Sequence, residues 1–532
     1  MNSVRKNTRY EAVHGVPPPG SKTIRNGSVT GMIQSGTINT RSGSVPGMIP
    51  PGSRSFYRVF AGDLTRPVFD RGIVWFLILT AGTIIATYFT NSIISSFWSL
   101  LLLVLYYRSD DEPLWLAFFL VTVDGFLGFM GLYSVTLTLF PGLPAIELSQ
   151  FYVMLAFIKA FSGRSRHPVF YRKYMQILGI YLIFLILWGL VMGLSSELNM
   201  YMRVLKTSIP FFLIFSLPRL MPDLHAYKRF FGIVFIIVLS AFALQIFSLI
   251  TGIYPAEAFV SAGEEIENDG AFRTFYNAIS TLIGLFGALL FLSIKGKTGF
   301  SSWMLLLVVF ASFLMAVLSA TRGWIIAFGF IILMFALFIQ TRDRRNLIRL
   351  AVVVAILIFA GSRSGRIRDQ IEFSRERLVT IESIRTGDPT AEGTLHRLDV
   401  RGPEVMRVWR ESPLFGWGFS DTGFRSSDGH VGNQTLLMFS GLAGFVLLNG
   451  FLLYFIYMIY IAYRRSPKAA PFRNGYLVFI IFLTGWFLIH STSSQQFYFN
   501  TVPLRVIPQA VFLGMSVIWY NLSLLTRKKG NV

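Results

Sequence analysis

The sequence contains no cysteine and few charged residues for its length. Of 532 residues, only 14% are charged, whereas 53% are hydrophobic and 16% are aromatic. The absence of cysteine excludes disulfides, thiolate metal sites and cysteine nucleophiles. The scarcity of charge excludes an ordinary soluble protein of this size, because such proteins carry charge on roughly a quarter of their residues.

Acidic residues are scarcer still, with 27 Asp and Glu against 48 Lys and Arg, which gives a net charge of +21. Such an excess can indicate nucleic-acid binding. Here, however, the basic residues fall mostly in short loops between apolar runs, as they do in the cytoplasmic loops of membrane proteins. We therefore expect a membrane protein and no nucleic-acid partner.

Apolar runs of roughly 20 residues predict helices that cross a bilayer, and their continuity disfavours a membrane β-barrel. The predicted fold class is all-α, a polytopic transmembrane helix bundle of about 12–14 spans with one large outer loop that contains short helices. Two of the predicted spans, 95–107 and 349–361, are short for a bilayer, so the number of crossings stays open. The predicted spans are 73–91, 95–107, 114–139, 145–161, 174–194, 199–220, 230–252, 274–294, 301–319, 323–340, 349–361, 433–461, 475–491 and 504–525.

The fourteen predicted crossings place both termini on one side, and the basic loops predict that this side is the cytoplasm. Residues 1–72, rich in Gly, Ser, Pro and Arg, are predicted to form a disordered basic cytoplasmic tail. Transmembrane helices are expected over 73–361 and 433–525, and a basic cytoplasmic tail over 526–532. Residues 362–432, which we call the long loop, are predicted to lie outside as a lid over an active site.

The motif SATRG, residues 319–323, interrupts an apolar run that extends from Ser301 to Gln340. A single helix over this run would be about 60 Å long, which is twice the thickness of the hydrocarbon core. The run must therefore fold back at SATRG. Counting the spans places Arg322 of this turn at the outer membrane surface.

The long loop holds eleven Arg and eleven acidic residues but no Lys. Arginine suits bidentate recognition of phosphates and carboxylates, although a solvated surface with local ion pairs is the better explanation for most of these residues. Residues 403–410 are predicted to form a short amphipathic helix that stops at Ser412 and Pro413. The next segment, PLFGWGF (413–419), predicts a tight glycine turn with exposed aromatic side chains.

Three histidines lie near the predicted outer surface. His430 stands between small residues where the long loop meets the next span, and a neutral imidazole is the usual general base near pH 7. His396 lies in the same loop and is a rival for this role. His490, near the end of a span, is interpreted as a packing group with satisfied hydrogen bonds.

Several charged or polar residues lie in or next to predicted spans. Arg203 and Lys206 share one side of a helix near its outer end, where they could bind an anionic head group or extend to the interface. Asp124 lies near the middle of its predicted span, which indicates either a functional acid or a buried ion pair. Arg273 and Asn277 begin a span on the outer side.

Together, these residues predict a site for a ligand with a tail in lipid and an anionic phosphate head. Charge-assisted hydrogen bonds from arginines would neutralise a departing diphosphate, with no metal and no cofactor. His430 would deprotonate an acceptor hydroxyl, so the predicted chemistry is glycosyl transfer from a lipid diphosphate. The arginines expected at this surface are Arg203, Arg273, Arg322 and Arg397.

Three motifs, in this order, resemble the O-antigen ligase and polymerase-like superfamily of bacterial envelope glycosyltransferases. They are SATRG, HRLDVRGPEVMRVWRESPLFGWG (396–418) and HVGNQTLLMFSGLAGF (430–445), and the resemblance covers about residues 270–460. It implies that Arg322 and Arg397 hold the donor diphosphate and that His430 is the base. Arg401 is an alternative to Arg397. Asn433 is expected to bind substrate, but it lies three residues after the histidine, whereas the family pattern has an asparagine directly after it. The alignment of this region therefore does not decide whether Arg397 or Arg401 is the second arginine of the site.

The resemblance implies a transferase of the bacterial inner membrane that uses an undecaprenyl-diphosphate-linked glycan donor and a glycan or lipid acceptor. A polymerase for surface polysaccharide or exopolysaccharide is expected first, and a ligase that transfers glycan to lipid A core or to protein is the alternative. Other expected partners are membrane lipids and proteins of polysaccharide export or chain-length control. A transporter that uses Asp124, Arg203 and Lys206 is the non-enzymatic alternative, but the sequence shows no duplicated halves.

Overall fold

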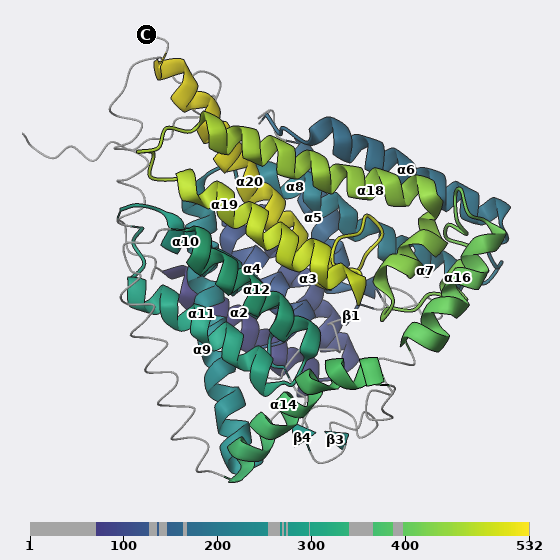
Figure 1. Cartoon of the computed structure of the whole chain (residues 1–532), viewed down its shortest axis with the longest axis horizontal. Helices are drawn as coiled ribbons and strands as arrows, with labels where there is room; N and C mark the ends of the chain where they lie inside the picture. The colour runs from purple at the N-terminus through teal and green to yellow at the C-terminus, as the bar shows by residue number, and fades with distance from the viewer. Residues whose placement is uncertain are drawn as a thin grey trace, which may run out of the picture. The chain divides into compact units, whose positions relative to one another are not determined.

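The part of the chain that the structure, a computed structural model, describes is almost entirely helical (Figure 1). Within it, two antiparallel pairs of very short strands complete the secondary structure. The predicted all-α bundle is confirmed. The described residues are 71–126, 136–137, 146–162, 168–253, 267–268, 271–272, 275–296, 298–339, 365–386 and 397–530.

The elements follow one another in two groups, before and after the SATRG turn. The first group is α2 (Arg71–Tyr88), α3 (Ser92–Arg108), α4 (Glu112–Asp124), β1 (Thr136–Leu137), β2 (Ile146–Glu147), α5 (Leu148–Ser162), α6 (Arg172–Val191), α7 (Leu198–Ser208), η1 (Ile209–Phe211), α8 (Phe212–Leu220), α9 (Leu224–Thr251), β3 (Glu267–Asn268), β4 (Ala271–Phe272), α10 (Ala278–Ser293) and α11 (Ser302–Leu318). The second group is α12 (Arg322–Phe338), α14 (Gly365–Thr386), η4 (Arg397–Arg401), α16 (Gly402–Glu411), α17 (Asp421–Arg425), α18 (Gly432–Arg465), α19 (Arg473–Phe482), η5 (Leu483–Ile489), η6 (His490–Thr492) and α20 (Pro503–Gly530).

The described helices are those of a multi-pass membrane protein. Six helical stretches are long and apolar enough to cross a bilayer, and six shorter apolar helices accompany them. Each predicted span in the described residues contains a helix, and the described part of the span predicted over 114–139 contains α4 and β1. The span predicted over 349–361 lies outside the described residues. So does the predicted N-terminal tail (1–72), apart from Arg71 and Gly72. The predicted tail at 526–532 continues α20 as far as Gly530.

Large apolar side chains are exposed along α2, α3 and α6. Ile93, Phe97 and Val191 are each more than 70% exposed, at 77%, 74% and 74%. In water such surfaces would favour aggregation, whereas a lipid environment makes them favourable. We therefore assign these faces to the lipid.

The centre of the bundle is α10, in which every residue from Ile279 to Ser293 is buried. It packs against α4, α9, α11, α19 and α20. Its N-terminus is capped by Asp124 of α4, whose carboxylate accepts hydrogen bonds from the backbone N–H groups of Ile279 (3.0 Å) and Ser280 (2.6 Å). Asp124 therefore satisfies free N–H groups of a helix terminus, and neither of the two roles predicted for it is needed to explain its position.

The long helix that follows the long loop, α18, is interrupted at Gly441. This residue has φ 62° and ψ −175°, a conformation that is open essentially to glycine alone. Residues 413–418 of the long loop lie against the interruption and form backbone hydrogen bonds of 2.8–3.0 Å with residues 438–443. This part of the loop therefore pairs with α18 at its interruption. The neighbouring helix α6 runs beside α18 (Figure 1).

The predicted amphipathic helix over 403–410 is confirmed as α16, which ends at Glu411. The prediction of exposed aromatic side chains in the following turn is wrong for all three of its rings, and Phe415 is half-buried against Trp188 of α6. Phe419 is fully buried, and Trp417 is half-buried, with its indole N–H donating to the carbonyl of Val408 at 2.8 Å. Insertion of the turn into α18 brings these rings into the protein interior.

Candidate functional site

Arg322 is the first residue of α12 and follows the predicted turn between α11 and α12, which is confirmed. Ala320 within the turn has a positive φ of 51°. The Arg322 side chain is half-buried, and Thr321 provides no side-chain cap for the helix. The start of α12 therefore has no side-chain cap, and the positive potential of the helix dipole adds to the charge of Arg322 there.

The first helix of the long loop, α14, is fixed to the same turn. Gln370 donates its side-chain amide to the carbonyl of Leu318 at 2.6 Å, and Ser374 donates its hydroxyl to the carbonyl of Val317 at 2.7 Å. Both side chains are buried. They satisfy carbonyls at the C-terminus of α11, so the long loop is anchored immediately before Arg322.

His430 lies in a second turn, which leads into α18. The carboxylate of Asp428 accepts the backbone N–H of His430 at 2.7 Å and forms an ion pair with Arg401 at 3.5 Å. Arg397 begins the same π-helix, η4, that ends at Arg401, so the choice between these two arginines stays open. The His430 side chain is exposed, and Asn433 is half-buried in the first turn of α18.

One short segment contacts both turns. We call residues 490–505 the connector, because they join η6 to the first turn of α20. A Cβ atom at Gly323 would lie 2.6 Å from Nε2 of His490, and one at Gly432 would overlap the carbonyl oxygen of Ser491. Only glycine permits such close packing, so the turns that carry Arg322 and His430 are brought to the same part of the protein.

His490 of the connector packs as predicted but is not fully satisfied. Its ring stacks on Trp486, with centroids 4.3 Å apart, and the side chain is only 7% exposed. Its Nδ1 atom nevertheless has no hydrogen bond within the described part of the chain, although the side chain of Gln496 lies beside the ring. The interpretation of His490 as a satisfied packing group is therefore wrong for this nitrogen.

Arg505 is a candidate residue that the sequence analysis missed. It lies in the first turn of α20, close enough to His490 for an electrostatic interaction. It forms no ion pair with any carboxylate among the described residues. A charge inside a predicted span is a recognised signal of function, and Arg505 lies inside the span predicted over 504–525, so that signal was present.

The predicted cation Arg203 belongs to α7, whose C-terminal end also joins the connector. The carbonyl of Thr207 accepts the backbone N–H of Thr501 at 3.0 Å. The Arg203 guanidinium stacks over the ring of Phe424, 4.5 Å from its centroid, and thereby links α7 to the long loop. Lys206 is half-buried on the same helix.

Asn277 lies at the start of α10, beside the Asp124 cap. It is buried, has a positive φ of 50°, and donates its side-chain amide to the carbonyl of Gly125. This contact is structural, and the predicted role of Asn277 in substrate binding remains a prediction. Arg273 and His396 lie outside the described residues.

Two π-helical segments lead into the candidate residues. The segment η4 ends at Arg401, and η5 ends at Ile489, immediately before His490. Such segments are frequent at functional sites because they displace side chains from regular helical positions. Separately, the uncapped starts of α12 and α18 create a locally positive region suited to an anion.

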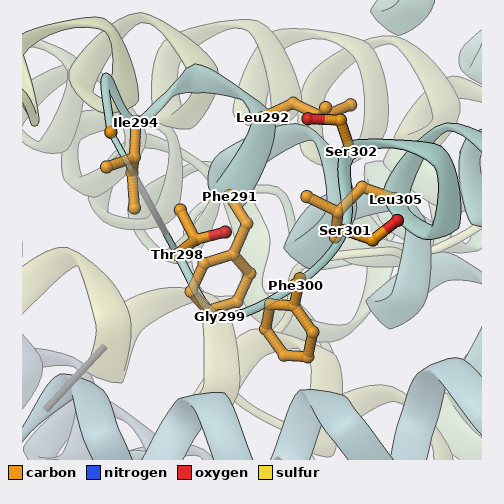
Figure 2. A pocket seen from close by; sticks show the side chains of 10 residues that line it. Phe291, Leu292, Ile294, Thr298, Gly299, Phe300, Ser301, Ser302 and Leu305 are labelled. Atoms are coloured by element: carbon orange, nitrogen blue, oxygen red, sulfur yellow. The ribbon is translucent and has the colours of Figure 1, made fainter. Parts of the chain in front are cut away.

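The cavity in Figure 2 lies away from this region. It has a volume of about 380 Å³ and is lined by residues of the α10–α11 connection, including Phe291, Thr298 and Phe300, with no charged residue. It adjoins the start of α11, whereas Arg322 follows its end. At 1.5 Å per residue, α11 separates the two by about 25 Å. An uncharged lining at that distance gives the cavity no part in binding a phosphate at the candidate site.

The fold and the site define a multi-pass membrane protein that gathers arginines and histidines at helix starts next to a long, anchored loop. Residues 306–440 match the family model of the O-antigen ligases. The predicted resemblance is thus confirmed over this segment, which is about a quarter of the chain. A search of curated proteins found no match to the chain. The matched segment includes Arg322, Arg397, Arg401, His430 and Asn433, but not the connector.

Proposed function

We propose that this protein is a metal-independent glycosyltransferase that joins undecaprenyl-diphosphate-linked glycan units at the outer face of the bacterial inner membrane. The favoured product is a surface polysaccharide or exopolysaccharide, which makes the protein a polymerase. The observation that carries the proposal is the packing of the Arg322 and His430 turns against one connector. Both turns lie within the segment that matches the O-antigen ligases.

In the proposed reaction, Arg322 and the N–H groups at the start of α12 bind the diphosphate of the donor. Arg401 or Arg397 contributes a further guanidinium from the long loop. His430 accepts the proton of an acceptor hydroxyl, and the oxygen attacks C1 of the first donor sugar. The bond between C1 and the phosphate oxygen breaks, and undecaprenyl diphosphate leaves with its negative charge stabilised by the arginines.

A ligase is the second candidate, because the matching family model is described by that activity. It would use the same donor site and the same base. Only the acceptor would differ, since the glycan would pass to lipid A core or to protein. The long loop borders the site and is where we expect this acceptor to be selected.

The decisive experiment uses the purified full chain in lipid nanodiscs, incubated with an undecaprenyl-diphosphate oligosaccharide, with and without lipid A core. We expect a ladder of extended products in both samples, unchanged by EDTA because the proposed mechanism uses no metal. Arg322→Ala should form product at least about a hundredfold more slowly, the scale of losing one preorganised transition-state contact.

A single transfer that requires lipid A core would instead identify the ligase. The absence of product from the wild-type chain in both samples would contradict the transferase. A loss of activity with EDTA that added metal restores would contradict the metal-independent mechanism. Unfolding temperatures of the wild-type chain and the Arg322→Ala variant, measured in parallel, control for folding.

A further inference from the structure

The connector lies outside the segment that matches the O-antigen ligases, yet it contacts α12, which begins at Arg322, α18, which follows His430, and α7, which carries Arg203. It packs against the first turn of α12 at Gly323 and against the first turn of α18 at Gly432. It also bonds to the end of α7 through Thr501. A segment in this position would line any ligand site that these three helices share.

Polar atoms in and beside the connector are buried without a hydrogen-bond partner among the described residues. Such atoms cost free energy, so native proteins rarely leave several of them together without a functional reason. A ligand with hydrogen-bond acceptors would supply partners for the two nitrogens, Nε2 of Gln495 and a protonated Nδ1 of His490, whereas the two amide oxygens, of Asn500 and Gln509, require donors. The atoms are Nδ1 of His490, Nε2 of Gln495, Oδ1 of Asn500 and Oε1 of Gln509.

The charge of the region indicates which kind of ligand it would bind. Arg505 has no ion pair with a carboxylate within the described part of the chain, and its electrostatic partner His490 touches the backbone next to Arg322. Two helix N-termini add positive potential at the same place. A compact anion with more than one negative group fits these donors best.

We infer that His490 and Arg505 form a second phosphate-binding position beside Arg322, so that each phosphate of a lipid diphosphate is held by its own arginine. His490 would donate from Nδ1 to a phosphate oxygen between the two guanidinium groups. This inference rests on the proposed function, because it assumes that the donor is a lipid diphosphate. It assigns diphosphate binding to residues of the connector, which lie outside the matched segment.

The test measures binding of undecaprenyl diphosphate, undecaprenyl monophosphate and phosphatidylglycerol to the full chain in phosphatidylcholine nanodiscs. Arg505→Ala should raise the Kd for the diphosphate by about tenfold to a hundredfold, the scale of one charge-assisted hydrogen bond. The monophosphate should be affected far less, because Arg322 alone can hold one phosphate. Arg505→Lys should recover part of the loss, and His490→Gln should weaken diphosphate binding by several fold.

Arg425→Ala is the matched control, because this arginine of the long loop is 78% exposed and pairs only weakly with Asp421 at 3.9 Å. Its diphosphate affinity should equal that of the wild-type chain. Unfolding temperatures confirm that every variant is folded, and Arg505→Met provides a second neutral variant if the alanine form is unstable.

Wild-type affinity in Arg505→Ala, combined with a loss in Arg322→Ala, would overturn this inference and leave the proposed function intact. An equal loss for the diphosphate and for phosphatidylglycerol would also overturn it, since the position would then hold a phospholipid head group. If the wild-type chain bound no undecaprenyl diphosphate, the inference and the proposed function would both fail.

Discussion

Two histidines lie near the Arg322 turn, and their surroundings give them different roles. His430 is exposed, and its backbone N–H is held by Asp428, so its ring is accessible to an acceptor. His490 is buried against Trp486 and touches the start of α12. An exposed imidazole can exchange protons with a bound hydroxyl, whereas a buried one is better suited to a fixed hydrogen bond.

This difference predicts the kinetics of His430→Ala. Loss of the base should lower kcat by about a hundredfold or more, the usual contribution of general base catalysis, and leave the Kd for undecaprenyl diphosphate unchanged. His490→Gln should show the opposite pattern, with a raised Kd and a smaller change in kcat. Single-turnover measurements together with donor binding distinguish the two. A loss of turnover in His396→Ala, with normal turnover in His430→Ala, would assign the base to His396.

Asp124 illustrates how a buried acid can have a structural role. Its two hydrogen bonds to the start of α10 account for its position without any substrate. A transporter would instead use such an acid in its substrate path.

We therefore expect Asp124→Ala to lower the free energy of unfolding by about 0.5–2 kcal/mol, the usual cost of removing a helix cap. Transfer activity per folded molecule should stay the same. Asp124→Asn keeps an oxygen acceptor and should lose less stability. Chemical denaturation and activity, measured on the same samples, check this. A variant of unchanged stability but without activity would support a functional acid.

At the scale of elements, two attachments fix the long loop to α11 and α18, in addition to its contacts with α6 and α7. One is α14, which bonds to the C-terminus of α11, and the other is the segment 413–418, which pairs with the interrupted part of α18. Both attachments use backbone carbonyls or N–H groups that a helix leaves free at an end or an interruption. The loop is thus fixed to the helix that ends just before the Arg322 turn and to the helix that follows His430.

Gly441→Ala tests the second attachment. The alanine would require a backbone conformation that L-residues avoid, and its Cβ would overlap the carbonyl of Leu414. We expect a loss of roughly 1–3 kcal/mol or more in the free energy of unfolding, and faster proteolysis of residues 362–432. Gly365→Ala is the control, because it lies in the same loop with open space around it. Equal protease resistance in both variants would show that the interruption does not hold the loop.

At the scale of the whole molecule, the proposed function requires that the long loop face away from the cytoplasm. The loops with basic residues predict this arrangement, and two of their cations also form ion pairs: Lys159 with Glu112 at 3.2 Å and Arg229 with Asp111 at 2.9 Å. Both pairs lie at the start of α4. Asp124, next to the start of α10, is at the other end of the same helix.

The absence of cysteine makes this orientation simple to test with single cysteine substitutions. Arg375→Cys lies on α14, where the arginine is 75% exposed, and Lys468→Cys lies in the exposed α18–α19 connection. A membrane-impermeant maleimide added to intact spheroplasts should label position 375 and not position 468. Permeabilisation should expose both. The reverse pattern in intact spheroplasts would place the candidate site in the cytoplasm and contradict the proposed function.

By itself, the sequence determined the helical membrane fold, the turn at Arg322, the helix α16 and the start of α18 near His430. Each of these depends on hydropathy, turn residues or stop signals within a short stretch of chain. Only the tertiary structure decided that Asp124 caps a helix 155 residues further on, that the segment 413–418 pairs with α18, and that His490 and Arg505 lie near Arg322. These contacts depend on which helices pack together, and the pattern of apolar residues along one helix does not specify its neighbours.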